Sequence, residues 1–230
     1  MMRAGHLEFA SRCASETYGA VACARQRLGV AALAGIALVA TLLDGCAGLR
    51  TAQSESPNLY VLEAKSLTKA ARAKRDVVLE VSGPRAWPGF DTPEMAYVQR
   101  PYELDHFAAS RWVDTPSRML APLLVQVLQQ TESFKAVMQS PSVVASDVRL
   151  DVELVRLQQD FQTRPSRIEL TLRVQIIDSR GRRVLASRLL EETENAPSDD
   201  AYGGVIAANA ALQRVLEHLA DFCVLESGSR

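Results

Sequence analysis

Two segments in the second half of the chain alternate strictly between apolar and polar side chains. Residues 148–154 and residues 168–176 place Val, Leu or Ile at every second position, with charged or polar residues between them. Because successive side chains of a strand point to opposite faces, this pattern predicts two half-buried β-strands. Val155 and Leu157 continue the first apolar set one residue out of step, so we predict a β-bulge near Leu154 that restores a single buried face.

Turn and helix signals surround these two segments. Residues 179–181 read Ser-Arg-Gly, a turn signal, and residues 183–192 are predicted as the return strand of a hairpin. Thr115 followed by Pro116 predicts a helix start, because a hydroxyl side chain suits the N-cap and proline suits the first helical position. Apolar residues then recur at helical spacing as far as Leu128, on a stripe suited to packing against a sheet.

The C-terminal part predicts a second long helix. Ser198, Asp199 and Asp200 supply an N-cap and acidic first-turn residues that suit the helix dipole, and apolar residues keep helical spacing to about Phe222. Shorter strands are predicted at residues 59–62, 76–81, 95–100 and 134–138. The order of elements predicts an α+β fold, a two-layer sandwich with a mostly antiparallel sheet and two helices packed on one face.

The N-terminal segment predicts export. Residues 28–43 contain no charged side chain and follow Arg25 and Arg27. The run is shorter than the about 20 apolar residues that a spanning helix needs, which favours a cleaved signal peptide over residues 1–45. Residues 1–24 would make an unusually long n-region for such a signal, so we expect translation to start further downstream, at Val21 or Leu28.

The apolar run ends in Leu43, Asp44, Gly45 and Cys46, which resembles the lipobox of bacterial lipoproteins. In that motif a leucine three positions before the cysteine and a small residue just before it admit the lipoprotein signal peptidase. Asp44 departs from the usual small or hydroxylated residue. A buried core cysteine is the alternative for Cys46, but the residue lies between an apolar run and a polar tract. We therefore expect Cys46 to be the lipidation site.

The chain after Cys46 divides into a tether and a domain. Residues 46–58 are small and polar, which is typical of a flexible tether, and residues 59–225 are expected to form the domain. Cys13 and Cys23 would leave with the signal peptide, and Cys223 then has no partner for an internal disulfide. We expect the domain to be stabilised by packing alone.

The charge balance and the motifs exclude several functions. The chain has 26 Lys plus Arg and 27 Asp plus Glu, so it lacks the excess of basic residues that nucleic-acid binders use to neutralise phosphates. His106 and His218 have no metal-ligand neighbour at the usual spacing. Gly203 and Gly204 lack the Lys and Ser/Thr of a phosphate-binding loop. We expect no enzymatic activity, no metal and no cofactor.

Two charged clusters in the C-terminal half have competing interpretations. The acidic cluster could bind Ca²⁺, but its spacing lacks the pattern of a calcium loop, so we interpret it as a solvated loop. The arginine cluster is an alternative docking face. The acidic residues are Glu191, Glu192, Glu194, Asp199 and Asp200, and the arginines are Arg164, Arg167, Arg180, Arg182, Arg183 and Arg188.

The chain resembles the auxiliary lipoproteins of ABC-type lipid transport systems, of the paraquat-inducible type. The resemblance covers residues 59–222. It is carried by the lipobox before this range and by hydrophobic patterns that contain aromatic residues at Tyr60, Tyr97, Trp112 and Tyr202. It implies a non-catalytic, periplasm-facing protein that works beside an MCE-domain protein and an ABC permease and ATPase. Outer-membrane anchoring through the lipid on Cys46 is also implied, and Ala47 after the cysteine is consistent with that sorting.

Two other functions remain open at this point. The first is a lipoprotein with a TolB-like domain that regulates a cell-wall synthase or a secretion complex. The second is a protein that itself carries or hydrolyses lipids. A closed apolar cavity or a buried pair of acids would favour the second.

Overall fold

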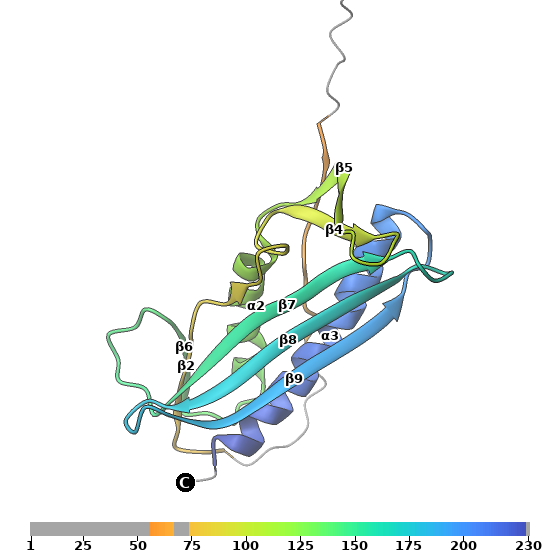
Figure 1. Cartoon of the computed structure of the whole chain (residues 1–230). Helices are drawn as coiled ribbons and strands as arrows, with labels where there is room; N and C mark the ends of the chain where they lie inside the picture. Colours follow the sequence, from red (N-terminus) through yellow and green to blue (C-terminus); the bar gives the residue numbers. More distant parts are fainter. Residues whose placement is uncertain (1–55, 67–73, 229–230) are drawn as a thin grey trace, which may run out of the picture. The chain divides into compact units, whose positions relative to one another are not determined.

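The computed structural model describes residues 56–66 and 74–228, which belong to one compact unit, residues 55–230 (Figure 1). The predicted signal peptide, Cys46 and most of the predicted tether lie outside the described residues. The strands are β1 (Asn58–Tyr60), β2 (Val78–Val81), β3 (Arg85–Ala86), β4 (Glu94–Val98), β5 (Asp105–Trp112), β6 (Ala136–Gln139), β7 (Val148–Asp160), β8 (Arg167–Asp178) and β9 (Arg183–Asn195). The helices are α2 (Pro116–Gln130) and α3 (Ala201–Glu226).

β7, β8 and β9 form a long antiparallel meander, as the alternating sequence predicts. The register of β7 against β8 shifts between Leu154 and Arg156, which confirms the bulge predicted near Leu154. Several elements are longer than predicted, including β7 and β8. β9 continues to Asn195 instead of ending at residue 192, and α3 continues to Glu226 instead of ending near Phe222.

The sheet as a whole is mixed, so the prediction of a mostly antiparallel sheet is only partly confirmed. β7 pairs in parallel with β2, β3 and β4, β2 pairs in parallel with β6, and β1 pairs in parallel with β5. β4 and β5 are antiparallel. Parallel neighbours require a long crossover connection, and the chain between β2 and β6, which includes α2, provides one. Alternation within a strand reveals which face is buried, but not the direction of the neighbouring strand.

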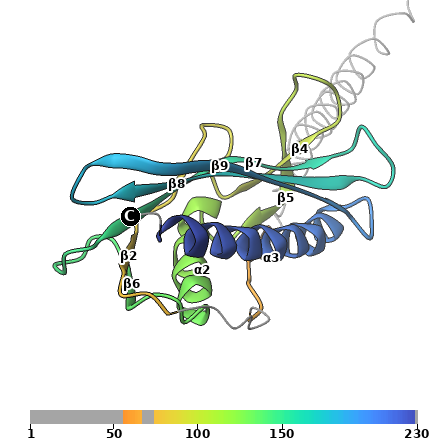
Figure 2. The ribbon, with the colours of Figure 1, turned by 90° about the horizontal axis from the view of Figure 1, so that it is seen from below.

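Both helices lie on the same side of the sheet (Figure 2). α3 packs along β8 and β9, and α2 packs mainly against β6, β2, β3 and β7. Leu154 and Leu172 from the sheet and Leu124 and Leu216 from the helices are completely buried in the shared core. β2 and β6 curve down beside α2, so the layers are less regular than a flat sandwich (Figure 2). The α+β class predicted from the sequence is confirmed.

α2 begins at the predicted residue, whereas α3 begins only at Ala201, and the two helices are capped differently. Thr115 occupies the N-cap position of α2 without making a side-chain capping hydrogen bond. Asp200 caps α3, because its Oδ1 accepts a hydrogen bond from the backbone N–H of Gly203 at 2.7 Å. Asp199 lies before the first turn, contrary to the prediction, and accepts a hydrogen bond from the backbone N–H of Ser166 at 2.7 Å. It therefore joins the β7–β8 turn to the start of α3.

Candidate functional site

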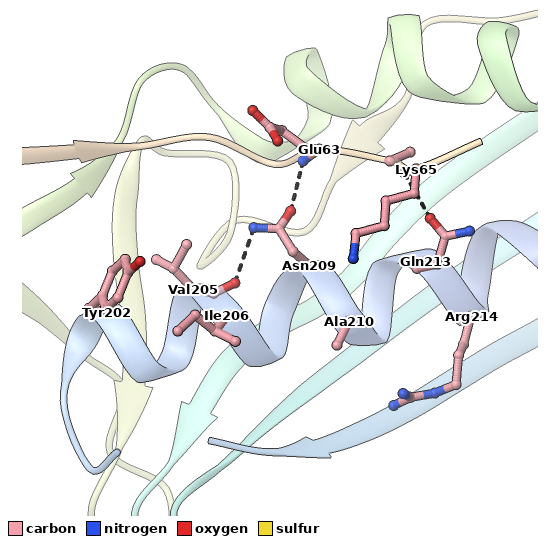
Figure 3. Close-up of a pocket in the computed structure, with 10 residues that line it drawn as sticks. Glu63, Lys65, Tyr202, Val205, Ile206, Asn209, Ala210, Gln213 and Arg214 are labelled. Atoms are coloured by element: carbon pink, nitrogen blue, oxygen red, sulfur yellow. Dashed lines mark hydrogen bonds between the residues drawn. The ribbon is translucent and has the colours of Figure 1, made fainter. Parts of the chain in front are cut away.

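An extended segment after β1 lies along the outer side of α3, and we call residues 61–65 the strap. The backbone N–H of Glu63 donates to Oδ1 of Asn209 at 2.7 Å, and that of Lys65 donates to Oε1 of Gln213 at 2.9 Å (Figure 3). Residues two apart in an extended chain are separated by about 6.6 Å along its axis, and residues four apart on a helix are separated by about 6 Å. This similar spacing lets two amide side chains hold the strap in register with α3.

Asn209 is the central anchor of the strap. Its Nδ2 donates to the carbonyl oxygen of Val61 at 3.3 Å and to that of Val205 at 3.1 Å. The side chain of Leu62, within the strap, is buried. Sequence reasoning missed this function of Asn209. An amide pair four residues apart on an otherwise alanine-rich helix was the available signal, but it could not identify a partner 146 residues away.

A groove of about 600 Å³ lies between the strap and α3 (Figure 3). Tyr202 and Ile206 give it a partly exposed apolar floor, and the Tyr60 ring lies 6.1 Å from that of Tyr202. The side chain of Lys65 points toward the helix, whereas that of Glu63 points away from it (Figure 3). The groove is lined by Glu63, Ala64, Lys65, Tyr202, Val205, Ile206, Asn209, Ala210, Gln213 and Arg214. Its volume is in the range of small-ligand sites.

Ion pairs close the side of this groove that faces β9. Nε of Arg214 donates to Glu192 at 2.8 Å and its Nη2 donates to Glu194 at 2.7 Å, and these carboxylates raise the pKa of Arg214. Nδ1 of His218 lies 3.3 Å from Glu192. The two glutamates therefore lie on β9 and pair with α3, rather than in the solvated loop that we expected. His218 contributes to this contact and remains largely exposed.

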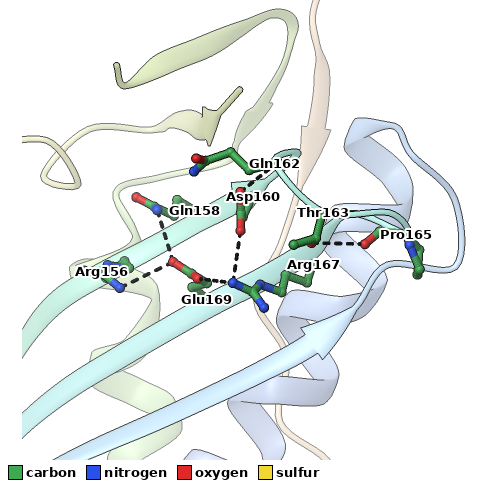
Figure 4. A network of polar contacts seen from close by, with 8 residues as sticks. All are labelled: Arg156, Gln158, Asp160, Gln162, Thr163, Pro165, Arg167 and Glu169. Atoms are coloured by element: carbon green, nitrogen blue, oxygen red, sulfur yellow. Dashed lines mark hydrogen bonds and ion pairs between the residues drawn. The ribbon is translucent and has the colours of Figure 1, made fainter. Parts of the chain in front are cut away.

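The face of the sheet away from the helices carries a network of polar contacts (Figure 4). Glu169 accepts hydrogen bonds from Arg156 at 3.3 Å, from Gln158 at 3.2 Å and from Arg167 at 3.2 Å. Arg167 also lies 3.2 Å from Asp160, which is almost fully buried. Positive and negative side chains are interspersed here, so this part of the open face is electrically balanced.

The arginines of the predicted cluster do not form one basic surface. Arg164 and Arg167 lie at one end of the β7–β8 hairpin, whereas Arg180, Arg182 and Arg183 lie at or beside the turn between β8 and β9. Arg188 lies within β9, with its guanidinium 4.9 Å from the centre of the Phe222 ring. β8 has 12 residues, so at about 3.3 Å per residue the two groups are about 40 Å apart. The alternative of a single arginine docking face is therefore wrong.

Gly203 and Gly204 are required by close packing at the start of α3. A Cβ on Gly203 would clash with the backbone carbonyl of Ser198. A Cβ on Gly204 would clash with the side-chain amide of Gln159, which is itself buried. The pair thus has a packing role, which agrees with the absence of phosphate-loop spacing in the sequence.

The described part of the chain offers little chemistry for catalysis. Within residues 56–66 and 74–228, no three His, Cys, Asp or Glu side chains are grouped so that they could hold a metal ion. His106 lies on β5, with its buried Nε2 lacking a hydrogen-bond partner. Cys223 is completely buried in α3, and that burial raises the pKa of its thiol far above the ordinary value, so it is not a reactive nucleophile. Over the same described ranges, neither helix combines the length and apolar character needed to cross a bilayer.

Comparison with known sequences identifies one protein family. The sequence model of the family described as ABC-type transport auxiliary lipoprotein component matches residues 60–220. An uncharacterised protein of Bradyrhizobium diazoefficiens is 27% identical over 121 residues. That alignment covers 52% of this chain and 32% of the relative, so the chain spans about a third of the relative's length.

Comparison with solved structures identifies the same fold in other proteins. Protein XCC0632 of Xanthomonas campestris superposes with a TM-score of 0.69 at 21% identity, covering 74% of this chain and 97% of that protein. A second, uncharacterised protein superposes with a TM-score of 0.58 at 12% identity, covering 73% of this chain and 98% of its own. At these identities the similarity establishes the fold alone.

Proposed function

The chain belongs to the family of ABC-type transport auxiliary lipoprotein components, and on that basis we propose that it is a non-catalytic, lipid-anchored subunit of an MCE-associated transport system. In this proposal the domain faces the periplasm from the outer membrane. It works beside an MCE-domain protein and an ABC permease and ATPase that move lipids or other hydrophobic solutes.

The match over residues 60–220 carries the proposal, because it extends from β1 almost to the end of α3. The lipobox-like residues 43–46 precede β1 by about a dozen residues, which is a suitable length for a tether. The exposed, open groove beside the strap differs from the closed apolar cavity that a dedicated lipid carrier would need. A binding and positioning role fits these features better than a catalytic one.

The anchor has a physical purpose in this proposal. Acyl chains contribute about 0.8 kcal/mol per buried CH₂ group, so a multiply acylated Cys46 would keep the domain at the membrane. A flexible tether then raises the effective concentration of the domain near a membrane-bound partner. The strap would attach the tether firmly to the body of the domain, because Asn209 and Gln213 hold it immediately after β1.

Mass spectrometry of the chain purified from a Gram-negative host tests the anchor. We expect the mature chain to begin at Cys46 with the mass of the attached lipid, and Cys46→Ser to abolish this modification and release the protein from membranes. Cys223→Ser is the matched control, because Cys223 is buried, and should leave the modification intact. An unmodified wild-type chain would refute the lipoprotein assignment.

Co-purification tests the partner separately from the anchor. The acylated, tagged chain should retain an MCE-domain protein and its permease after gentle detergent extraction, and the unacylated Cys46→Ser variant should retain less of both. Recovery of a cell-wall synthase or secretion complex in their place would support the TolB-like alternative and contradict the transport proposal.

A further inference from the structure

Each end of the domain carries an exposed apolar side chain. At one end, the hairpin between β4 and β5 carries Tyr102, which is fully exposed, and Leu104, which is 38% exposed. At the other end, the loop between β6 and β7 carries Val143, which is also fully exposed. β7 has 13 residues and runs between these ends, so they are separated by about 40 Å.

The chain enters β1 from the hairpin side, because β1 runs parallel to β5 and its first residue, Asn58, pairs with Ser110, five residues beyond the start of β5. β1 pairs with β5, β5 pairs with β4, and β4 pairs with the last three residues of β7. The loop that carries Val143 precedes the first residue of β7 and lies at the opposite end (Figure 1). About 12 residues separate Cys46 from β1, and a flexible chain of that length has a root-mean-square span of about 20 Å. The point at which a tether would join β1 is therefore nearer to the hairpin end than to the Val143 end.

We infer that the β4–β5 hairpin contacts the headgroup layer of the bilayer that holds the acylated Cys46, with Tyr102 as the inserted side chain. This inference rests on the lipid anchor proposed above and adds a defined orientation to it. The Val143 end then points away from the membrane, toward the partner complex.

The backbone of Tyr102 supports a role outside folding. Its φ of 67° lies in the left-handed region, which favours glycine and disfavours a bulky aromatic residue. The side chain is fully exposed, so packing within the described domain does not compensate for this conformation. Strained, exposed residues of this kind are typical of contact sites. A tyrosine suits a membrane surface in particular, because its ring is apolar and its hydroxyl can remain hydrated.

The surroundings of Tyr102 suit contact with lipid headgroups. Arg100 and Glu103 form an ion pair at 2.7 Å beside it, so the charge of Glu103 is balanced within the loop, and Asp105 follows at the start of β5. Behind the tip, the ring of Tyr97 lies 4.7 Å from that of Phe107 and 5.9 Å from that of Phe161. Aromatic pairs at these distances stabilise one another, so this packing should hold the two strands of the hairpin in place.

Fluorescence quenching in vesicles tests the orientation. Tyr102→Trp and Val143→Trp each place a new indole at a fully exposed position, one at each end of the domain. The acylated full chains are reconstituted into phosphatidylcholine and phosphatidylglycerol vesicles, with and without lipids brominated near the headgroup. The emission of the parent chain, which contains Trp87 and Trp112, is subtracted. We expect the new indole of Tyr102→Trp to lose emission and shift to the blue, and that of Val143→Trp to be unchanged.

The outcomes separate this inference from the function on which it rests. A wild-type chain that does not float with the vesicles overturns the anchor, and the orientation with it. A chain that floats, with quenching equal at both positions, stronger at position 143 or absent from both, overturns the orientation and leaves the anchor standing.

Discussion

The two faces of the β7–β9 sheet use alternate residues of the same strands, but different interactions stabilise them. On the face covered by the helices, Leu154, Leu172 and Leu190 are buried. On the open face, Arg156 and Glu169 pair with each other and stay partly exposed. Burial of a large apolar side chain contributes about 1.5–3 kcal/mol, whereas an exposed ion pair contributes about 0–1 kcal/mol. The covered face therefore supplies most of the stability.

The residues that stabilise the fold are therefore different from the exposed residues that could bind a membrane or a partner. The hairpin tip at Tyr102 and the groove floor at Ile206 expose apolar atoms that contribute little to the core. Substitutions there should alter contacts with a membrane or a partner while the domain stays folded. Substitutions on the covered face should instead lower the free energy of unfolding, and any effect on function would follow from that loss of stability.

The largest expected effect comes from neighbouring leucines that point to opposite faces of β9. Leu190 is 6% exposed and Leu189 is 48% exposed. Leu190→Ala should lower the free energy of unfolding by about 2–5 kcal/mol, because it leaves a cavity under α3. Leu189→Ala, the matched control, should cost less than about 1 kcal/mol. Urea unfolding followed by circular dichroism measures both, and equal costs would contradict the proposed difference between the faces.

A smaller effect should come from the tight packing at the start of α3. Gly203→Ala should cost about 1–3 kcal/mol, because the new methyl group meets the backbone of Ser198, which can move away only by shifting the helix start. Gly83→Ala is the control, since a Cβ there would meet nothing within 4 Å. Thermal unfolding of both variants distinguishes a packing role from a general effect of removing glycine. Equal melting temperatures would show that the turn before α3 is free to adjust.

The sequence predicted the covered face better than the rest of the fold. Alternation over residues 148–154 and 168–176 identified the buried side of β7 and β8, and the change of parity located the bulge near Leu154. These features depend on burial, which leaves a periodic pattern in the residues themselves. The parallel pairing of β2 with β6 and β7 depends on segments far apart in the chain, and no local pattern encodes it.

The candidate sites were the least predictable part for the same reason. Asn209 is polar and lies on a helix surface, where polar residues are ordinary, so its contact with the strap leaves no distinct sequence signal. Tyr102 is exposed, and an exposed residue belongs to no periodic pattern. Cys46 is the exception, because its lipobox context is local, and its lipidation stays a prediction.

The strap provides a test of the amide contacts on the outer side of α3. Asn209→Ala removes hydrogen bonds to the strap and should cost about 1 kcal/mol, with several-fold faster hydrogen exchange at the amide of Glu63. Gln213→Ala should accelerate exchange mainly at the amide of Lys65. Exchange measured by NMR compares the two positions. Unchanged rates at Glu63 in the first variant would show that Asn209 does not hold the strap.

The smallest expected effect is a pH dependence at the junction between the β7–β8 turn and α3. Hydrogen bonds from the backbone amide and the hydroxyl of Ser166 lower the pKa of Asp199 below its ordinary value of 3.8. A carboxyl group whose pKa is lower in the folded state stabilises the fold above the pKa of the unfolded chain. That contribution is lost as the pH falls through the folded value. The stability of the wild type should therefore fall between about pH 5 and pH 3, and Asp199→Asn should make this fall shallower.

The variant isolates one carboxylate because it leaves every other acidic side chain in place. The amide side chain introduced by Asp199→Asn would still offer an oxygen to the backbone N–H of Ser166, so the local geometry should survive at neutral pH. Glu191→Gln, on the exposed side of β9, controls for the loss of one negative charge. Urea unfolding at pH 7, 5, 4 and 3 measures the difference. Parallel curves for wild type and Asp199→Asn would show that this carboxylate does not link α3 to the β7–β8 turn. The stability of this junction would then depend on packing around Gly203, as on the covered face.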